Sequence, residues 1–206
     1  SEKLLAYELG YRRQLTPQAS VDIAGFVNDY SHLRDFSLGA LTLGTGLPRQ
    51  FILSTLANNH ASALTYGFEV TTDWKPKSNW RLQGNYSFID MQISSNPLTR
   101  NFDSTTSGTD KVTPQHQISI RSNYDLSEKL EVNLWLRYVS HIAYYNVPGF
   151  VTMDARVAYK PLKNVELFVV GQNLFSQNHQ ELGADFIPSS PALIPRGIYG
   201  GAQLRF

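Results

Sequence analysis

Apolar and polar side chains alternate with a period of two along most of this chain, which predicts β-strands whose two faces meet different surroundings. Segment 130–138 is the clearest example. One face carries Leu130, Val132, Leu134, Leu136 and Tyr138. The other face carries Glu131, Asn133, Trp135 and Arg137. The same alternation is found in 4–15, 64–74, 80–88, 117–126, 151–160 and 196–206. No segment has a convincing helical period.

The predicted strands are longer than those of most soluble proteins. A strand of about ten residues crosses a bilayer when it is tilted, whereas globular strands usually have about five or six residues. The mean hydropathy of −0.27 would normally indicate a soluble protein. That inference does not hold for a membrane β-barrel, because lipid-facing and lumen-facing residues alternate and their hydropathies average out. The pattern therefore predicts an all-β fold, an antiparallel transmembrane β-barrel segment.

The connections between the predicted strands alternate in length. We expect about nine strands, at 4–15, 20–33, 51–75, 80–93, 115–127, 130–141, 150–160, 164–174 and 196–206. Short turns fall at 16–19, 76–79, 127–129 and 161–164, and long links at 34–49, 94–114, 142–149 and 176–195. This regularity requires 51–75 to be one long strand, with a break near Asn58 and Asn59. Short periplasmic turns and longer outer loops are typical of outer-membrane barrels.

An odd number of strands places the two ends of the chain on opposite sides of the membrane. Ser1 is then on the outer side and Phe206 in the periplasm. A bacterial single-chain barrel normally has an even number of strands with both ends in the periplasm. We therefore expect residues 1–206 to be one C-terminal portion of a larger barrel. The opening SEKLLAYELGYR also lacks the features of a signal peptide.

Composition and motifs argue against several other classes of protein. The net charge is +1 and no run of Lys or Arg occurs, so nucleic acid is not an expected partner. The chain has no cysteine, and its five histidines lack the spacing of a helical zinc site. No G-x-S-x-G motif is present, and the GGAQ near the end does not precede a helix. We expect no enzyme activity, no metal site and no cofactor.

Apart from Arg13, which lies close to a turn on the apolar face, most charged residues of the alternating strands fall on one face, which we assign to a wet lumen. An arginine turned to lipid at the bilayer midplane would cost roughly 2–4 kcal/mol. We expect most of these charges to pair across strands or to contact a domain inside the barrel, and a minority to contact ligand. They are Glu8, Arg12, Glu69, Asp73, Arg81, Arg121, Asp125, Glu131, Arg137, Asp154, Arg156, Lys160 and Arg205.

Four internal segments and the C-terminus resemble known outer-membrane proteins. The internal segments are YELGYR at 7–12, NDY at 28–30, YGFEV at 66–70 and GQNLF at 171–175. In order and spacing they resemble TonB-dependent receptors over essentially the whole chain. The ending YGGAQLRF resembles the C-terminal assembly signal of outer-membrane barrels, with Tyr199, Gly201, Leu204 and Phe206 in its characteristic positions. That resemblance implies recognition by the barrel-assembly machinery through strand addition.

The family resemblance implies a location in the outer membrane of Gram-negative bacteria, surrounded by its lipid. It also implies a 22-stranded barrel, plugged by an N-terminal domain that engages the TonB complex. Such a receptor imports a scarce metal chelate, usually a ferric siderophore and sometimes cobalamin. The plug and the TonB-binding segment are absent from this sequence. Two alternatives remain: a structural, adhesive or pore-forming barrel without TonB coupling, and a soluble β-sandwich that binds a ligand.

Candidate ligand contacts lie in the predicted outer loops, at Arg100, Phe102, Tyr144, Tyr145, His179 and Phe186. A ferric siderophore is bulky, often aromatic and often anionic, so tyrosine and arginine at the barrel mouth would suit it through stacking and charge. The alternative is that these residues form a membrane-interface belt or pack the loops internally.

Overall fold

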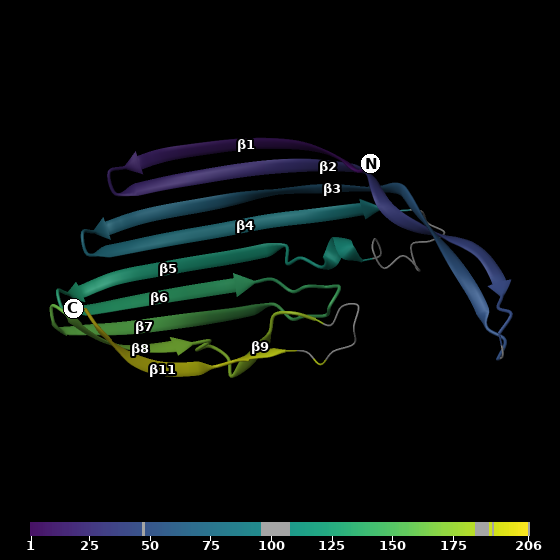
Figure 1. Ribbon diagram of the computed structural model, residues 1–206. Helices are drawn as coiled ribbons and strands as arrows, with labels where there is room; N and C mark the ends of the chain where they lie inside the picture. Colours follow the sequence, from purple (N-terminus) through teal and green to yellow (C-terminus); the bar gives the residue numbers. More distant parts are fainter. Residues whose placement is uncertain (47, 96–107, 184–189, 191, 206) are drawn as a thin grey trace. The chain divides into compact units, whose positions relative to one another are not determined.

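The computed structural model describes residues 1–46, 48–95, 108–183, 190 and 192–205 (Figure 1). Its main feature is an antiparallel sheet of nine strands in the order β1-β2-β3-β4-β5-β6-β7-β8-β11. The strands are β1 (Lys3–Thr16), β2 (Ala19–Leu43), β3 (Phe51–Lys77), β4 (Trp80–Ser94), β5 (His116–Ser127), β6 (Leu130–Val139), β7 (Phe150–Leu162), β8 (Val165–Gln172) and β11 (Gly197–Leu204). β9 (Asn178–Gln180) and β10 (Leu193–Pro195) form a separate two-stranded sheet.

The nine predicted strands are confirmed, most of them to within two residues at each end. Two details of the prediction are wrong. Residues 34–43 belong to β2 rather than to a loop, and β3 runs without a break through Asn58 and Asn59. The irregular residue is His32, whose φ of 59° puts it in the left-handed region. Beyond it the chain stays extended, and a bond from the Gly44 N–H to the Gln50 carbonyl (2.7 Å) closes the β2–β3 hairpin.

The only helix among the described residues is the single 3-10 turn η1 (Thr109–Lys111). No helix in the described part of the chain is long and apolar enough to span a membrane.

The chain divides into two compact units, which are described separately. Unit 1 comprises Ser1–Glu8, Phe26–Tyr66 and Asp90–Thr113, and unit 2 comprises Leu9–Gly25, Gly67–Ile89 and Pro114–Phe206.

In unit 1 a buried carboxylate stabilises the β2–β3 hairpin. Asp35 is 1% exposed. Its Oδ1 accepts a hydrogen bond of 3.0 Å from the His60 backbone N–H.

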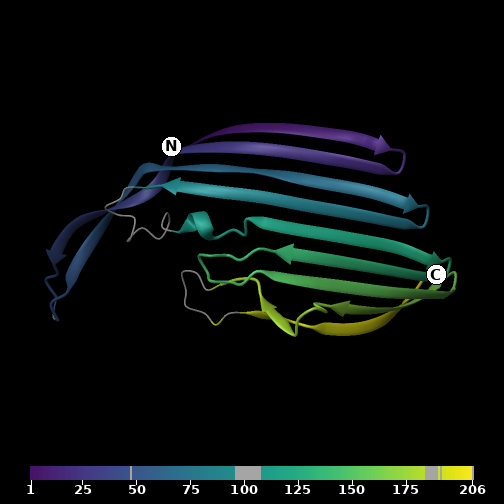
Figure 2. The same ribbon diagram turned by 180° about the vertical axis from the view of Figure 1, so that it is seen from behind.

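All four short turns belong to unit 2 and gather at one end of its strands, with the end of β11 (Figures 1 and 2). Each turn bonds to the strand that follows its hairpin in the sheet. The donors are backbone N–H groups and the acceptors are backbone carbonyls, at 2.7–2.9 Å. The pairs, donor first, are Lys75 and Gln18, Asp125 and Asn79, Lys160 and Lys129, and Arg205 and Asn164. The predicted asymmetry of short turns at one end and long links at the other is thus present in unit 2.

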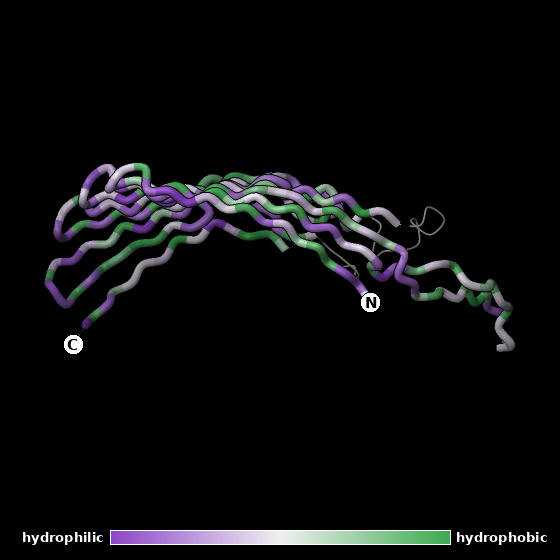
Figure 3. The backbone as a smooth tube through the Cα atoms, turned by 90° about the horizontal axis from the view of Figure 1, so that it is seen from above, coloured by the Kyte–Doolittle hydropathy of each residue, from purple (hydrophilic) through white to green (hydrophobic). Residues whose placement is uncertain are grey.

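Large apolar side chains of the strands are exposed rather than buried in a core. Leu64, Phe68 and Leu134 are 37%, 40% and 38% exposed. Among the described residues, the buried hydrophobic ones are Ala61, Ala63, Ile142, Val147 and Ala158. Hydrophobic and hydrophilic residues alternate along the strands (Figure 3). Among the described residues, these large apolar side chains are therefore not packed into the buried core that a soluble β-sandwich would form.

The strand register keeps each kind of side chain on one face across the sheet of unit 2. Arg121 lies opposite Trp135, which lies opposite Asp154. On the other face Ile120 lies opposite Leu136, which lies opposite Met153. Because directly opposed residues point to the same side of a sheet, the polar face predicted from the sequence is continuous across β5, β6 and β7.

Gly201 leaves room for an aromatic ring on the neighbouring strand. It lies opposite Phe168, and a Cβ atom at this position would come within 2.6 Å of the Phe168 Cζ. We expect Gly201→Ala to destabilise the β8–β11 pairing by about 1–3 kcal/mol through overpacking. The folded fraction can be measured by electrophoresis before and after heating, because the mobility of a barrel changes when heat unfolds it. Removing the ring in the double variant Gly201→Ala, Phe168→Ala should relieve the clash, and an equal loss with and without the ring would refute this explanation.

Candidate functional site

Residues 140–149, which contain the predicted outer link 142–149, form a compact reverse turn in unit 2. Ile142 and Val147 make reciprocal backbone hydrogen bonds of 3.0 and 3.1 Å, and their side chains are 8% and 2% exposed. Asn146 turns the chain with a φ of 51°. The turn between these two residues presents Tyr144 and Tyr145, whose rings meet edge to face at 4.9 Å. Tyr144 is 40% exposed and so offers its ring to solvent.

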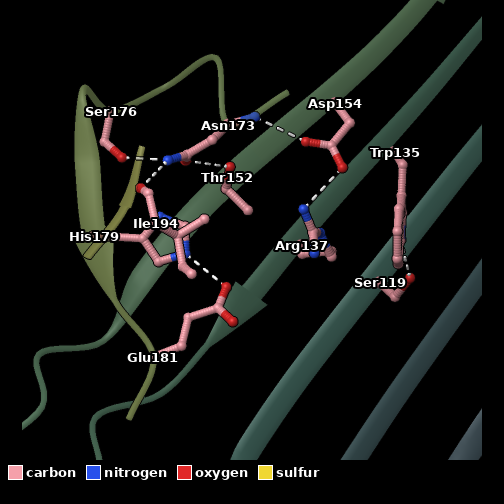
Figure 4. Close-up of polar contacts among 10 residues, drawn as sticks. All are labelled: Ser119, Trp135, Arg137, Thr152, Asp154, Asn173, Ser176, His179, Glu181 and Ile194. Atoms are coloured by element: carbon pink, nitrogen blue, oxygen red, sulfur yellow. Dashed lines mark hydrogen bonds and ion pairs between the residues drawn. The ribbon is translucent and has the colours of Figure 1, made fainter. Parts of the chain in front are cut away.

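The second outer link of unit 2 is anchored by Asn173, directly after β8 (Figure 4). This residue is 2% exposed and has a φ of 54°, a conformation that asparagine tolerates better than most residues. Its Oδ1 accepts bonds from the Thr152 hydroxyl (2.8 Å) and the Ser176 hydroxyl (3.2 Å). Its Nδ2 donates to the carbonyl of Ile194 (2.8 Å). One side chain thus joins both ends of the link to β7.

His179 packs inward in this link. Its ring lies 4.1 Å from the ring of Phe150, and its Nε2 is 2.7 Å from the Glu181 carboxylate. The side chain is 8% exposed, so it supports the loop more than it meets solvent. The two links also touch each other, because a Cβ atom at Gly183 would lie 2.3 Å from the Cβ of Tyr145. Unit 2 therefore brings Tyr144, Tyr145 and His179 into one loop cluster.

The other three predicted ligand contacts, Arg100, Phe102 and Phe186, lie outside the described residues, as does Phe206 of the predicted assembly signal. Tyr199, Gly201 and Leu204 of that signal lie on β11. Tyr199 and Gly201 share the polar face with Val170 and Phe168, their partners on β8.

The polar face carries a chain of ion pairs between neighbouring strands. Arg137 of β6 donates to Asp154 of β7 (2.8 Å), whose other oxygen accepts the backbone N–H of Asn173 (2.9 Å; Figure 4). Nearer the short turns, two cations and two carboxylates alternate: Arg156, Lys160, Glu131 and Glu166. Arg12 pairs with Asp22, and Arg81 with Asp73. Cross-strand pairing, the expected role of these charges, is therefore their main observed role.

The chemistry of these residues favours binding and structural roles. Among the described residues, no three His, Cys, Asp or Glu side chains gather closely enough to hold a metal ion. The loop cluster offers aromatic rings, and the polar face offers guanidinium, amide and hydroxyl groups. Such groups orient a polar ligand or a protein segment without breaking bonds in it.

Comparison with known proteins agrees with this architecture. The family model described as TonB dependent receptor-like, beta-barrel matches residues 1–174. The chain belongs to the TonB-dependent receptor family. It is a segment of an outer-membrane barrel. Among curated proteins, none matches this sequence.

Solved structures of TonB-dependent receptors share this fold at low sequence identity. The ferric-catecholate import receptor Fiu from Escherichia coli K12 has a TM-score of 0.73 at 16% identity, over 100% of this chain and 28% of its own. The pyoverdine receptor FpvA from Pseudomonas aeruginosa PAO1, bound to pyoverdine, scores 0.71 at 16% identity, over 100% and 30%. The copper transporter OprC scores 0.65 at 17% identity, over 100% and 32%. This chain spans less than a third of each of these receptors.

Sequence reasoning missed the central role of Asn173 in this TonB-dependent receptor segment. The GQNLF motif at 171–175 includes Asn173 but does not predict which residues Asn173 contacts. The partners Thr152 and Ile194 are each 21 residues away along the chain. The available signal was an asparagine at the end of the predicted strand 164–174, just before a long link.

Proposed function

We propose that this chain forms the C-terminal wall of an outer-membrane receptor that imports a scarce metal chelate, with ferric siderophores as the leading ligand class. The family match over residues 1–174 carries the proposal. The names of two similar receptors support the ligand class, since Fiu imports ferric catecholates and FpvA is bound to pyoverdine. The copper transporter OprC supports a second candidate, an importer of cobalamin or another metal complex. A structural or pore-forming barrel without TonB coupling is the remaining alternative.

In the proposed mechanism the outer loops capture the chelate and the barrel wall orients it. Tyr144 and Tyr145 would stack on the ligand, as would Phe102 and Phe186, while Arg100 would pair with its charge. His179 would hold the loop cluster in shape through Phe150 and Glu181. The partners in this proposal are a plug domain, the TonB complex that acts on it, the barrel-assembly machinery that recognises β11, and outer-membrane lipid.

Uptake of radiolabelled ligand by cells that carry the intact receptor tests this function. We expect accumulation of iron from a ferric-catecholate or ferric-pyoverdine complex, and its loss when TonB is deleted. Uptake of labelled cobalamin in place of iron would favour the second candidate. Uptake that is independent of TonB would contradict the proposal and favour a passive pore.

Tyr144→Ala should weaken chelate binding about two- to twelvefold, because an aromatic contact contributes about 0.5–1.5 kcal/mol beyond area burial. Equilibrium binding of the ferric complex to the purified receptor measures this effect. Tyr159→Ala is the matched control, since Tyr159 is similarly exposed (46% against 40%) but lies on the apolar face near the short turns. Equal affinities for both variants would remove Tyr144 from the proposed binding surface.

A further inference from the structure

The end of unit 2 that holds the four short turns is basic (Figures 1 and 2). In or near each turn lies an exposed cation that makes no ion pair within the described part of the chain. We call these residues the basic rim: Arg13, Lys77, Lys129 and Lys163. Lys75 and Arg205 add exposed cations on the polar face of the same end, where the unpaired carboxylates among the described residues are Asp125 and Glu128. Cations therefore outnumber carboxylates at this end.

Aromatic side chains of the apolar face lie close to the basic rim. Tyr11, Trp74 and Tyr159 are 53%, 49% and 46% exposed on this face. Trp80 lies opposite Tyr124 in the strand register, and their ring centroids are 5.5 Å apart. Tryptophan and tyrosine collect at membrane interfaces, where the ring meets hydrocarbon and its polar atom meets the headgroups. We therefore expect the boundary between hydrocarbon and headgroups at this aromatic row.

The distance from the aromatic row to the turns matches the thickness of a headgroup layer. Lys77 ends β3 three residues beyond Trp74, which is about 10 Å along the strand. A strand tilt of about 45° turns this length into about 7 Å of depth, and the headgroup layer on each side of a bilayer is about 5–8 Å thick. The cations of the turns are therefore expected at the level of the lipid phosphates.

Arg13 brings a cation onto the apolar face itself at this level. Successive side chains of a strand alternate between its two faces, so Arg13 shares the face of Tyr11 and Leu15. Leu15 is 58% exposed. An arginine that faces lipid is costly at the bilayer midplane but is tolerated near the interface, where its guanidinium group reaches the headgroups. Arg13 can therefore contact a lipid phosphate from the apolar face.

We propose that the basic rim binds the phosphate groups of anionic phospholipids in the periplasmic leaflet of the outer membrane. The short turns of outer-membrane barrels lie on the periplasmic side. Guanidinium and ammonium groups bind phosphate through charge-assisted hydrogen bonds. Successive turns are two strand spacings apart, or about 10 Å, so a phosphate between two turns lies within about one Debye length of both cations.

The position of the basic rim favours a lipid over an acidic protein of the periplasm. The cations directly follow the aromatic row of the apolar face, so they continue the surface that we expect to contact lipid. The inference goes beyond import, because it concerns the lipid that surrounds the barrel rather than the cargo that passes through it.

Electron spin resonance of the intact receptor in phosphatidylcholine bilayers tests the proposal, because spin-labelled lipids that contact the barrel lose mobility. We expect labelled phosphatidylglycerol to associate about two- to fivefold more strongly than labelled phosphatidylcholine. Salt at about 1 M should weaken this preference, because it shortens the Debye length to about 3 Å. The variant that lacks the rim charges should lose at least half of the preference; it combines Arg13→Gln, Lys77→Gln, Lys129→Gln and Lys163→Gln.

A charge-matched control separates the position of these cations from the net charge of the receptor. It removes four exposed cations that lie away from the short turns, through Arg34→Gln, Arg49→Gln, Lys111→Gln and Arg196→Gln. This control should keep the preference for phosphatidylglycerol. Equal association of both lipids with the wild type would overturn the proposal, as would a preference that the rim variant retains or that both variants lose equally.

The rim variant is expected to fold, because the four side chains are exposed and make no ion pair among the described residues. Electrophoresis before and after heating verifies this. The lipid measurement needs neither TonB nor a chelate. A failure of the proposed import function would therefore leave the lipid preference in place, and a failure of the lipid proposal would leave uptake unchanged.

Discussion

Ile120→Arg should lower the free energy of unfolding by about 2–4 kcal/mol, the cost of an arginine at the bilayer midplane. Ile120 is in the middle of β5 and 44% exposed on the apolar face, opposite Gly84 and Leu136. In a soluble protein an arginine at so exposed a position would change stability by less than about 0.5 kcal/mol. Denaturant unfolding of the receptor in lipid vesicles measures the difference.

Asn85→Arg is the control for depth. Asn85 lies opposite Ser119, one residue along from the Gly84–Ile120 pair, and is exposed on the polar face. An arginine there meets the wet lumen at the same level of the sheet and should change stability by less than about 0.5 kcal/mol. Equal free energies of unfolding for Ile120→Arg and Asn85→Arg would show that the two faces of the sheet do not meet different solvents.

Asn173→Ala should destabilise the second outer link by about 4 kcal/mol. The variant loses three side-chain hydrogen bonds, each worth about 1 kcal/mol net, and places alanine in the left-handed region at a cost of about 1 kcal/mol. The backbone N–H groups of Leu174 and Arg196 report on the link, since they bond to Met153 and Gln177 (both 2.9 Å). Their protection from hydrogen exchange should fall roughly 1000-fold.

Asn146→Ala separates the backbone contribution from that of the side chain. Asn146 also has a positive φ, 51°, but it is exposed and its side chain makes no hydrogen bond among the described residues. Its replacement should cost only about 1 kcal/mol. A similar loss of protection from hydrogen exchange in Asn146→Ala and Asn173→Ala would show that the side-chain contacts of Asn173 contribute little to stability.

The alternating strands were predictable because lipid and water impose opposite requirements on successive residues. β6 and β7 follow the pattern closely, and their ends differ from the prediction by at most two residues. The far part of β2 carries Leu38, Ala40, Leu41 and Leu43, so apolar residues occupy both of its faces. Without alternation the sequence gives no strand signal, and this part of β2 was predicted as a loop.

The loop cluster and the stacking of Arg121 and Arg137 on Trp135 depend on contacts that the sequence pattern does not contain. Alternation placed Arg121, Trp135 and Arg137 on one face, but only the register of β5 and β6 sets Arg121 opposite Trp135. The outer links lack a period, so the packing of His179 on Phe150 and of Tyr145 on Gly183 could not be predicted from spacing.

We expect one face of the sheet to meet hydrocarbon and the other face to meet water. The chain has no cysteine, so single cysteine substitutions can be made at each position from 130 to 138. The measurement is the rate of labelling by a membrane-impermeant maleimide in the membrane-embedded receptor. We expect fast labelling at odd positions, where Glu131 and Arg137 lie, and slow labelling at even positions, where Leu134 and Leu136 lie. Equal rates at odd and even positions would show that the two faces do not differ in their exposure to water.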